Sequence, residues 1–167
     1  IQELAVSEEA RPSDPSGRLP LLKISPPADS VKDALKAIRN AERPVIIVGH
    51  GAKSSMEKIL RFAEHLRLPV ITTFKGKGLI PDHHPLACGV LGLSGTPVAS
   101  HFMSDSDLLI VYGASFSKHT GIMKAKPTIH VDFDPMGLGK FHAVSTPVWG
   151  EIGTTVDIFM KELLNDL

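Results

Sequence analysis

Apolar residues recur every three or four positions in four parts of the chain, which is the pattern of an amphipathic helix. In the first part Ser30 and Asp33 form a capping pair, and in the second Ser54 or Ser55 is the expected N-cap. Thr96-Pro97 is typical of an N-cap followed by the first helical position. The predicted helices cover residues 30–41, 56–66, 97–104 and 152–163.

Short apolar runs rich in β-branched residues lie between these helices. The run Pro44-Val45-Ile46-Ile47-Val48-Gly49 has no polar alternation, so both faces of this strand are expected to be covered. The predicted strands cover residues 44–49, 69–73, 108–112, 128–131 and 147–149. Because strands alternate with helices, the sequence predicts an α/β fold with a parallel sheet and right-handed crossovers.

The composition suits one domain with a sizeable core, since 43% of the 167 residues are hydrophobic. The 18 Lys and Arg balance 18 Asp and Glu, so no field of one sign attracts nucleic acid or an anionic membrane. No apolar run approaches the roughly 20 residues that span a bilayer. Cys88 is the single cysteine, which excludes an internal disulfide and makes a reducing cytosol the expected compartment.

The first 28 residues differ from the rest, because prolines separated by Ser and Gly disfavour both helix and ladder pairing. We expect residues 1–28 to be an interdomain linker that lies over a surface. The chain begins at Ile1 without an initiator methionine, so we expect it to be a piece of a longer protein.

Glycines follow the predicted strands, at the edge where an open parallel sheet binds ligands. Gly49-His50-Gly51 has the first two glycines of a dinucleotide fingerprint, although a tight turn alone also favours glycine. Lys75-Gly76-Lys77-Gly78 combines backbone donors with two cations, which suits either a phosphate or a solvated turn. Asp132 ends a strand, where a carboxylate can accept bonds from ribose hydroxyls.

Two other features favour structural interpretations. Asp82-His83-His84 lacks the spacing of a metal site, because adjacent residues rarely point at one ion. Cys88 lies among small apolar residues, which predicts a buried and inert thiol.

Six motifs also occur in the order found in the central domain of thiamine diphosphate-dependent enzymes such as acetolactate synthase, pyruvate oxidase, benzoylformate decarboxylase and oxalyl-CoA decarboxylase. The resemblance covers residue 41 to the C-terminus. The motifs are Arg43 through Ala52, Pro69 through Gly78, Asp82-His83-His84-Pro85, Gly89 through Gly95, Asp107 through Phe116, and Ile129 through Pro135.

The resemblance implies that residues 29–167 form a three-layer, Rossmann-like parallel sheet of about six strands with helices on both faces. Thiamine diphosphate and Mg²⁺ would be bound by flanking pyrimidine-binding and diphosphate-binding domains of the same chain. No residue of this chain is therefore expected to be catalytic or to ligate a metal. The complete enzyme is expected to be cytoplasmic and homo-oligomeric.

Relatives of this type bind FAD, ADP or no nucleotide in the central domain. By position, the residues that match the nucleotide groove are Gly49, Gly51, Thr73, Lys75, Gly76, Gly113, Ala114, Ser115, Phe116, Asp132 and Glu151. If the groove binds a nucleotide, Gly51→Val is expected to abolish binding and to leave the sheet folded.

Two departures from the acetolactate synthase pattern leave the cofactor open between FAD and ADP. Ser115-Phe116-Ser117-Lys118-His119 stands where arginines are expected near FAD, and Glu151 stands where many members have aspartate. A nucleotide-free spacer that orders the catalytic domains is the main alternative. An independent NAD-dependent deacylase-like enzyme is a weaker one, because such enzymes would bring a cysteine zinc site.

Overall fold

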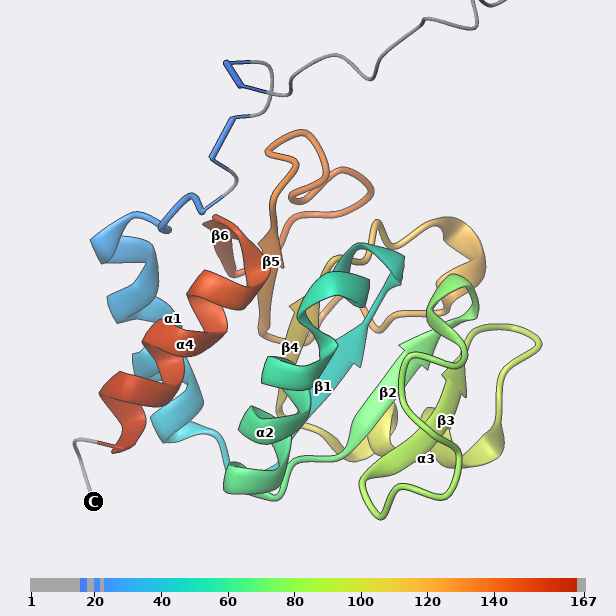
Figure 1. The fold of residues 1–167 in the computed structure, drawn as a ribbon. Coiled ribbons are helices and arrows are strands. Elements are labelled where there is room, and N and C mark those ends of the chain that lie inside the picture. Colours follow the sequence, from blue (N-terminus) through green and yellow to red (C-terminus); the bar gives the residue numbers. More distant parts are fainter. Residues whose placement is uncertain (1–15, 18–19, 22, 165–167) are drawn as a thin grey trace, which may run out of the picture.

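The computed structural model describes residues 16–17, 20–21 and 23–164, so most of the expected linker lies outside the described residues. Figure 1 shows one sheet with helices packed against it. The strands are β1 (Pro44–Val48), β2 (Val70–Thr73), β3 (Ala87–Leu91), β4 (Leu108–Tyr112), β5 (Thr128–Asp132) and β6 (Thr146–Trp149). The α-helices are α1 (Ala28–Asn40), α2 (Met56–Leu66), α3 (Pro97–Asp105) and α4 (Ile152–Leu164), and the 3₁₀ helices are η1 (His50–Ser55), η2 (Phe74–Gly76) and η3 (Lys118–Thr120).

All six strands are parallel and follow the order β3-β2-β1-β4-β5-β6. The chain moves outward from β1 to β3 and then returns to the other side of β1 as β4. The order of the strands therefore reverses between β1 and β4. In open α/β sheets the crevice outside such a reversal is where ligands bind.

Side chains of the central strands point alternately to two cores, as the two-residue period of a strand requires. Ile46 and Val48 pack with α1, α2 and α4 on one face, while Val45 and Ile47 pack with α3 on the other. Figure 1 shows α1, α2 and α4 on the same side of the sheet. The three-layer α/β fold expected from the sequence is confirmed.

The predicted strands are confirmed to within one residue at each end, but β3 was not predicted. It is an edge strand that contains Gly89 at φ +85°, and its register against β2 shifts between Val70 and Thr72. Cys88 in β3 is buried, and this burial raises the pKa of its thiol, as expected for an inert cysteine.

One predicted helix start is wrong, and at a second the predicted N-cap residue is confirmed but makes no side-chain cap bond. Helix α1 begins at Ala28, so Ser30 lies inside its first turn and does not cap it with Asp33. Ser55 occupies the N-cap position of α2, but its hydroxyl donates to Glu151 Oε1 at 3.3 Å and no side-chain cap forms. The cap predicted at Thr96 is confirmed, because its Oγ1 accepts a hydrogen bond from the Ala99 amide at 3.3 Å.

Candidate functional site

A groove of about 530 Å³ lies outside the carboxyl ends of the strands, at the reversal of strand order. It collects residues from the ends of β1, β2, β4 and β5, which are far apart in the sequence. Nine of the predicted site residues line it: Gly49, Gly51, Thr73, Lys75, Gly113, Ala114, Ser115, Phe116 and Asp132.

The other two predicted residues have different positions. Gly76 is buried, and a Cβ there would lie 2.7 Å from the Val48 carbonyl oxygen, so close packing explains this glycine. Glu151 lines a neighbouring hollow of about 470 Å³. Gly51 lines both hollows, so the two adjoin at this residue.

The glycines after β1 allow two segments of backbone to pack closely together. The Gly49 amide donates to the Tyr112 carbonyl at 2.9 Å, and the Gly51 amide donates to the Gly113 carbonyl at 3.0 Å. A Cβ on Gly49 would overlap the Gly113 carbonyl oxygen, and one on Gly51 would lie 3.0 Å from Gly113 Cα. These two amides are therefore already paired. A side chain at Gly51 would press against the Gly113 backbone, so packing alone also explains this glycine, and the expected effect of Gly51→Val stays a prediction.

Cationic and acidic side chains line the groove together. Lys75 and Lys140 are both exposed on it, and within the described residues neither forms an ion pair. The Asp132 side chain is 19% exposed, and its Oδ1 accepts a hydrogen bond from the Asp134 amide at 2.9 Å. Two cations and a carboxylate suit a ligand that carries both phosphate and hydroxyl groups.

Glu151 caps its own helix. Its carboxylate accepts hydrogen bonds from the Gly153 amide at 2.8 Å and from the Thr154 amide and hydroxyl, both at 2.6 Å. Burial by itself would raise the pKa of this carboxyl, but the hydrogen bonds from Thr154, Gly153 and Ser55 lower it below its ordinary value. Both oxygens are thus engaged at the start of α4.

Several groove residues were missed by the sequence reasoning. Phe74 and Lys140 line the groove but belong to no periodic pattern. Beneath the groove, the Phe116 ring lies 5.2 Å from the rings of both His130 and His142, measured between centroids. The sequence carries no signal for this contact, because it joins three separate segments of the chain.

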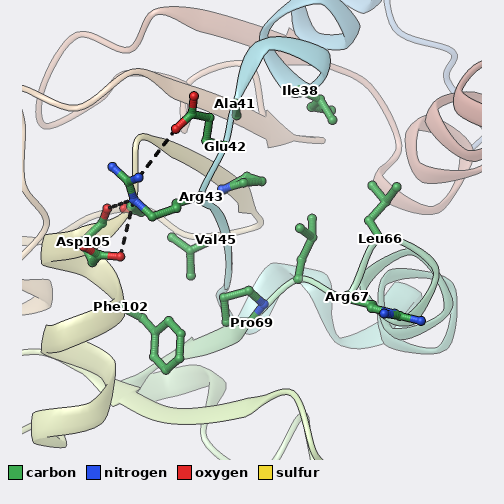
Figure 2. A pocket seen from close by; sticks show the side chains of 13 residues that line it. Ile38, Ala41, Glu42, Arg43, Val45, Leu66, Arg67, Pro69, Phe102 and Asp105 are labelled. Atoms are coloured by element: carbon green, nitrogen blue, oxygen red, sulfur yellow. Dashed lines mark hydrogen bonds and ion pairs between the residues drawn. The ribbon is translucent and has the colours of Figure 1, made fainter.

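A third hollow, of about 410 Å³, lies at the opposite edge of the sheet, where β1 and β2 begin. Figure 2 shows Val45, Pro69, Phe102, Leu66 and Ile38 around it, with an ion-pair cluster at one side. There the Arg43 Nε donates to the Asp105 carbonyl at 3.0 Å and lies 3.4 Å from its carboxylate.

Comparison with known proteins identifies the family. Residues 31–159 match the family model described as thiamine pyrophosphate enzyme, central domain. The chain belongs to this family. As such a central domain it implies flanking domains in the same chain, and the match confirms the resemblance seen in the sequence.

The similar proteins are acetolactate synthases and a related protein. The chain is 39% identical over 144 residues to the probable acetolactate synthase large subunit of Methanococcus aeolicus, which covers 82% of this chain and 23% of that protein. It is 34% identical to the putative thiamine pyrophosphate-containing protein YdaP of Bacillus subtilis, over 73% of this chain and 21% of that protein. It is 33% identical to acetolactate synthase 2, chloroplastic, of Zea mays, over 83% of this chain and 23% of that protein. This central domain of acetolactate synthase-like enzymes therefore spans about a quarter of the relatives' length.

The described residues contain neither a membrane-spanning helix nor a cluster of metal ligands. No helix among them has the length and apolar character needed to cross a membrane. In the same residues, no three His, Cys, Asp or Glu side chains are grouped so that they could hold a metal ion.

Proposed function

We propose that this chain is the nucleotide-binding module of a thiamine diphosphate-dependent enzyme that processes 2-oxo acids. It binds FAD or ADP in the carboxyl-edge groove and has no catalytic activity of its own. The observation that carries the proposal is the groove, where nine residues expected from the family resemblance meet at the reversal of strand order.

The side chains that line the groove, rather than its backbone amides, fit a bound diphosphate. Lys75 and Lys140 supply two cations without ion-pair partners among the described residues, and Asp132 supplies an acceptor for ribose hydroxyls. The amides of Gly49 and Gly51 do not fit this role, because each donates to a carbonyl of the neighbouring chain segment. Binding therefore depends on lysines rather than on the glycine amides that a dinucleotide fingerprint uses.

Thiamine diphosphate and Mg²⁺ would be held by the flanking domains. The groove residues bind and orient the nucleotide, and activation of the thiazolium ring belongs to the flanking domains in this proposal. The cytoplasmic location and the homo-oligomeric state of the complete enzyme stay predictions.

A nucleotide-free spacer is the second candidate, and two observations favour it. The Gly49 and Gly51 amides are paired within the fold, and the Glu151 carboxylate caps α4, so three groups expected to meet a nucleotide have structural partners. The deacylase alternative is no longer supported, since the chain belongs to the thiamine pyrophosphate enzyme family.

Thermal unfolding of the chain with millimolar ADP or FAD separates the two candidates, because a ligand that binds the native state raises the melting temperature. Lys75→Gln is expected to weaken ADP binding about tenfold, the effect of losing one charge-assisted hydrogen bond. Lys77→Gln is the matched control, because Lys77 is also exposed but does not line the groove.

The nucleotide proposal fails, and the spacer replaces it, if neither nucleotide shifts the melting temperature and the complete protein purifies without FAD or ADP. If Lys75→Gln and Lys77→Gln weaken ADP binding equally, the effect comes from the positive charge of the whole loop and not from a contact made by Lys75. Tight calorimetric binding of thiamine diphosphate with Mg²⁺ by this chain alone would overturn the assignment of that cofactor to the flanking domains.

A further inference from the structure

The hollow of about 410 Å³ where β1 and β2 begin, called here the amino-edge hollow, has an apolar floor that the fold leaves partly open. Of the residues that line it, Val45 and Leu68 are buried. Leu66, Pro69 and Phe102 also line it and are half-buried, and Figure 2 shows that they come from separate elements. Apolar side chains gathered in one hollow, rather than scattered singly, favour contact with another apolar surface.

The polar groups at the end of α3, beside this floor, already have partners. The Ser106 amide donates to the Phe102 carbonyl at 3.0 Å. The Lys126 ammonium donates to the Ser104 carbonyl at 2.7 Å and also to the Ser106 carbonyl. Arg43 donates to the Asp105 carbonyl, as described above. These carbonyls are therefore satisfied within the fold and need no bound cation.

Arg67 differs from these groups. It lines the amino-edge hollow, is exposed, and forms no ion pair with the described residues. Figure 2 shows it on the opposite side of the hollow from Arg43. A guanidinium binds a carboxylate through charge-assisted hydrogen bonds. An apolar floor with one such cation beside it suits a polypeptide that carries an apolar side chain and an acidic one.

Helix α4 ends at the same edge of the sheet. It packs against α1 and α2, and Figure 1 shows that it ends on the side where β1 and β2 begin. Near its end, Leu163 packs against the core that Ala41 and Leu66 also contact, while Leu164 is 44% exposed. Ala41 and Leu66 both line the amino-edge hollow. The polypeptide that follows α4 therefore leaves the domain beside this hollow.

We propose that the amino-edge hollow docks the segment that follows α4 in the complete protein. An apolar side chain of that segment packs on Pro69 and Phe102, and a carboxylate of the segment pairs with Arg67. The family supplies the occupant, because a central domain implies flanking domains in the same chain. Docking fixes the direction in which the next domain leaves this one. The proposal is independent of nucleotide binding, since the hollow and the groove lie at opposite edges of the sheet.

The first test is photo-crosslinking in the complete protein. With p-benzoylphenylalanine in place of Phe102, light is expected to join this position to a peptide within about 15 residues after Leu167 of the same chain, a length typical of connections between elements. The same replacement of Phe74, which is 74% exposed at the opposite edge, is the control and gives no crosslink to that peptide. A crosslink from position 102 to a second copy or to a different protein, or none at all, overturns the proposal.

The second test leaves the apolar floor unchanged. Arg67→Gln in the complete protein is expected to speed limited proteolysis between this domain and the following one about threefold, the effect of losing one exposed ion pair. The difference should vanish at high salt. Lys36→Gln is the matched control, because Lys36 is also exposed but does not line the hollow. An unchanged rate for Arg67→Gln, or the same increase for Lys36→Gln, overturns the proposal.

Discussion

The two hollows at opposite edges of the sheet are similar in size but differ in what closes them. The groove at the carboxyl edge, about 530 Å³, is formed by turns whose backbones touch and by lysines without ion pairs among the described residues. The hollow at the amino edge, about 410 Å³, has an apolar floor and an arginine held by acidic neighbours. The Arg43 charge at the amino edge thus has partners in the fold, while the Lys75 and Lys140 charges of the groove have no ion-pair partner among the described residues.

The difference follows from how parallel strands begin and end. At the amino edge the Asp107 carboxylate accepts hydrogen bonds from the Glu42 amide at 2.7 Å and the Arg43 amide at 3.0 Å, which ties the starts of β1 and β4 together. At the carboxyl edge glycine lets the same two strands meet through their backbones, without side chains between them. Volume alone therefore does not distinguish the candidate site from the hollow at the amino edge.

Gly49→Ala should have the largest effect, because its Cβ would overlap the Gly113 carbonyl and separate β1 from β4. We expect a loss of about 3 kcal/mol in the free energy of unfolding, measured in urea. Gly78→Ala is the control: nothing lies within 4 Å of its Cβ, so only the strain of φ +85° remains, about 1 kcal/mol. If both variants lose the same unfolding free energy, the close contact between the Gly49 and Gly113 backbones does not stabilise this edge of the sheet.

Phe102→Ala tests the apolar floor of the amino edge. Phe102 is half-buried there, so its truncation should cost about 2 kcal/mol of unfolding free energy. Nucleotide-induced shifts in melting temperature should stay unchanged, since the residue lies at the edge opposite the groove. A weaker shift with ADP would mean that the two edges are coupled.

Glu151→Gln tests the cap of α4 and should cost about 1 kcal/mol at pH 7. Because the pKa of Glu151 is lowered in the folded chain, its carboxylate contributes stability above pH 4.5, its ordinary value, and loses it as the pH falls through the folded pKa. The native chain should therefore lose more stability below pH 4.5 than the variant does. If the unfolding free energies of the native chain and of Glu151→Gln change with pH in the same way, the Glu151 carboxylate does not stabilise the start of α4.

The smallest expected effect is on the unfolding free energy when one charged side chain is removed from each edge of the sheet. Arg43→Gln removes an exposed, paired charge and should lower the unfolding free energy by about 0.5 kcal/mol, less at high salt. Lys75→Gln should leave stability unchanged, because no ion pair in the described part of the chain depends on that lysine. A destabilised Lys75 variant would reveal a structural role and weaken the case for a phosphate site.

The fold was predictable from the sequence where a strand is buried on both of its faces, because such a strand must consist of apolar residues. Strands β1 and β4 consist of β-branched and other apolar side chains because both of their faces are covered, and this pattern is visible without a structure. Strand β3 was not visible, since an edge strand with Gly89 depends on pairing with β2 rather than on its own composition.

The candidate site was predictable in position more than in role. Sequence shows that Gly49 lacks a side chain, but not that the Gly113 backbone, rather than a phosphate, fills the space. It shows that Glu151 precedes a helix, but not that both of its oxygens bind that helix's first turn. The contact of Phe116 with His142 joins two irregular segments, for which no periodic pattern exists.

The strand order also determines what a growing chain exposes during synthesis. Residues 28–105 contain β1, β2 and β3, which are neighbours in the sheet and can pair as soon as they emerge. The other edge of β1 then waits for β4, with its backbone groups unpaired and its side chains among the most buried of the finished domain. Until then that edge of β1 can pair with a strand of another chain. Synthesis of residues 106–112, which complete β4, therefore ends the interval in which this edge is unprotected.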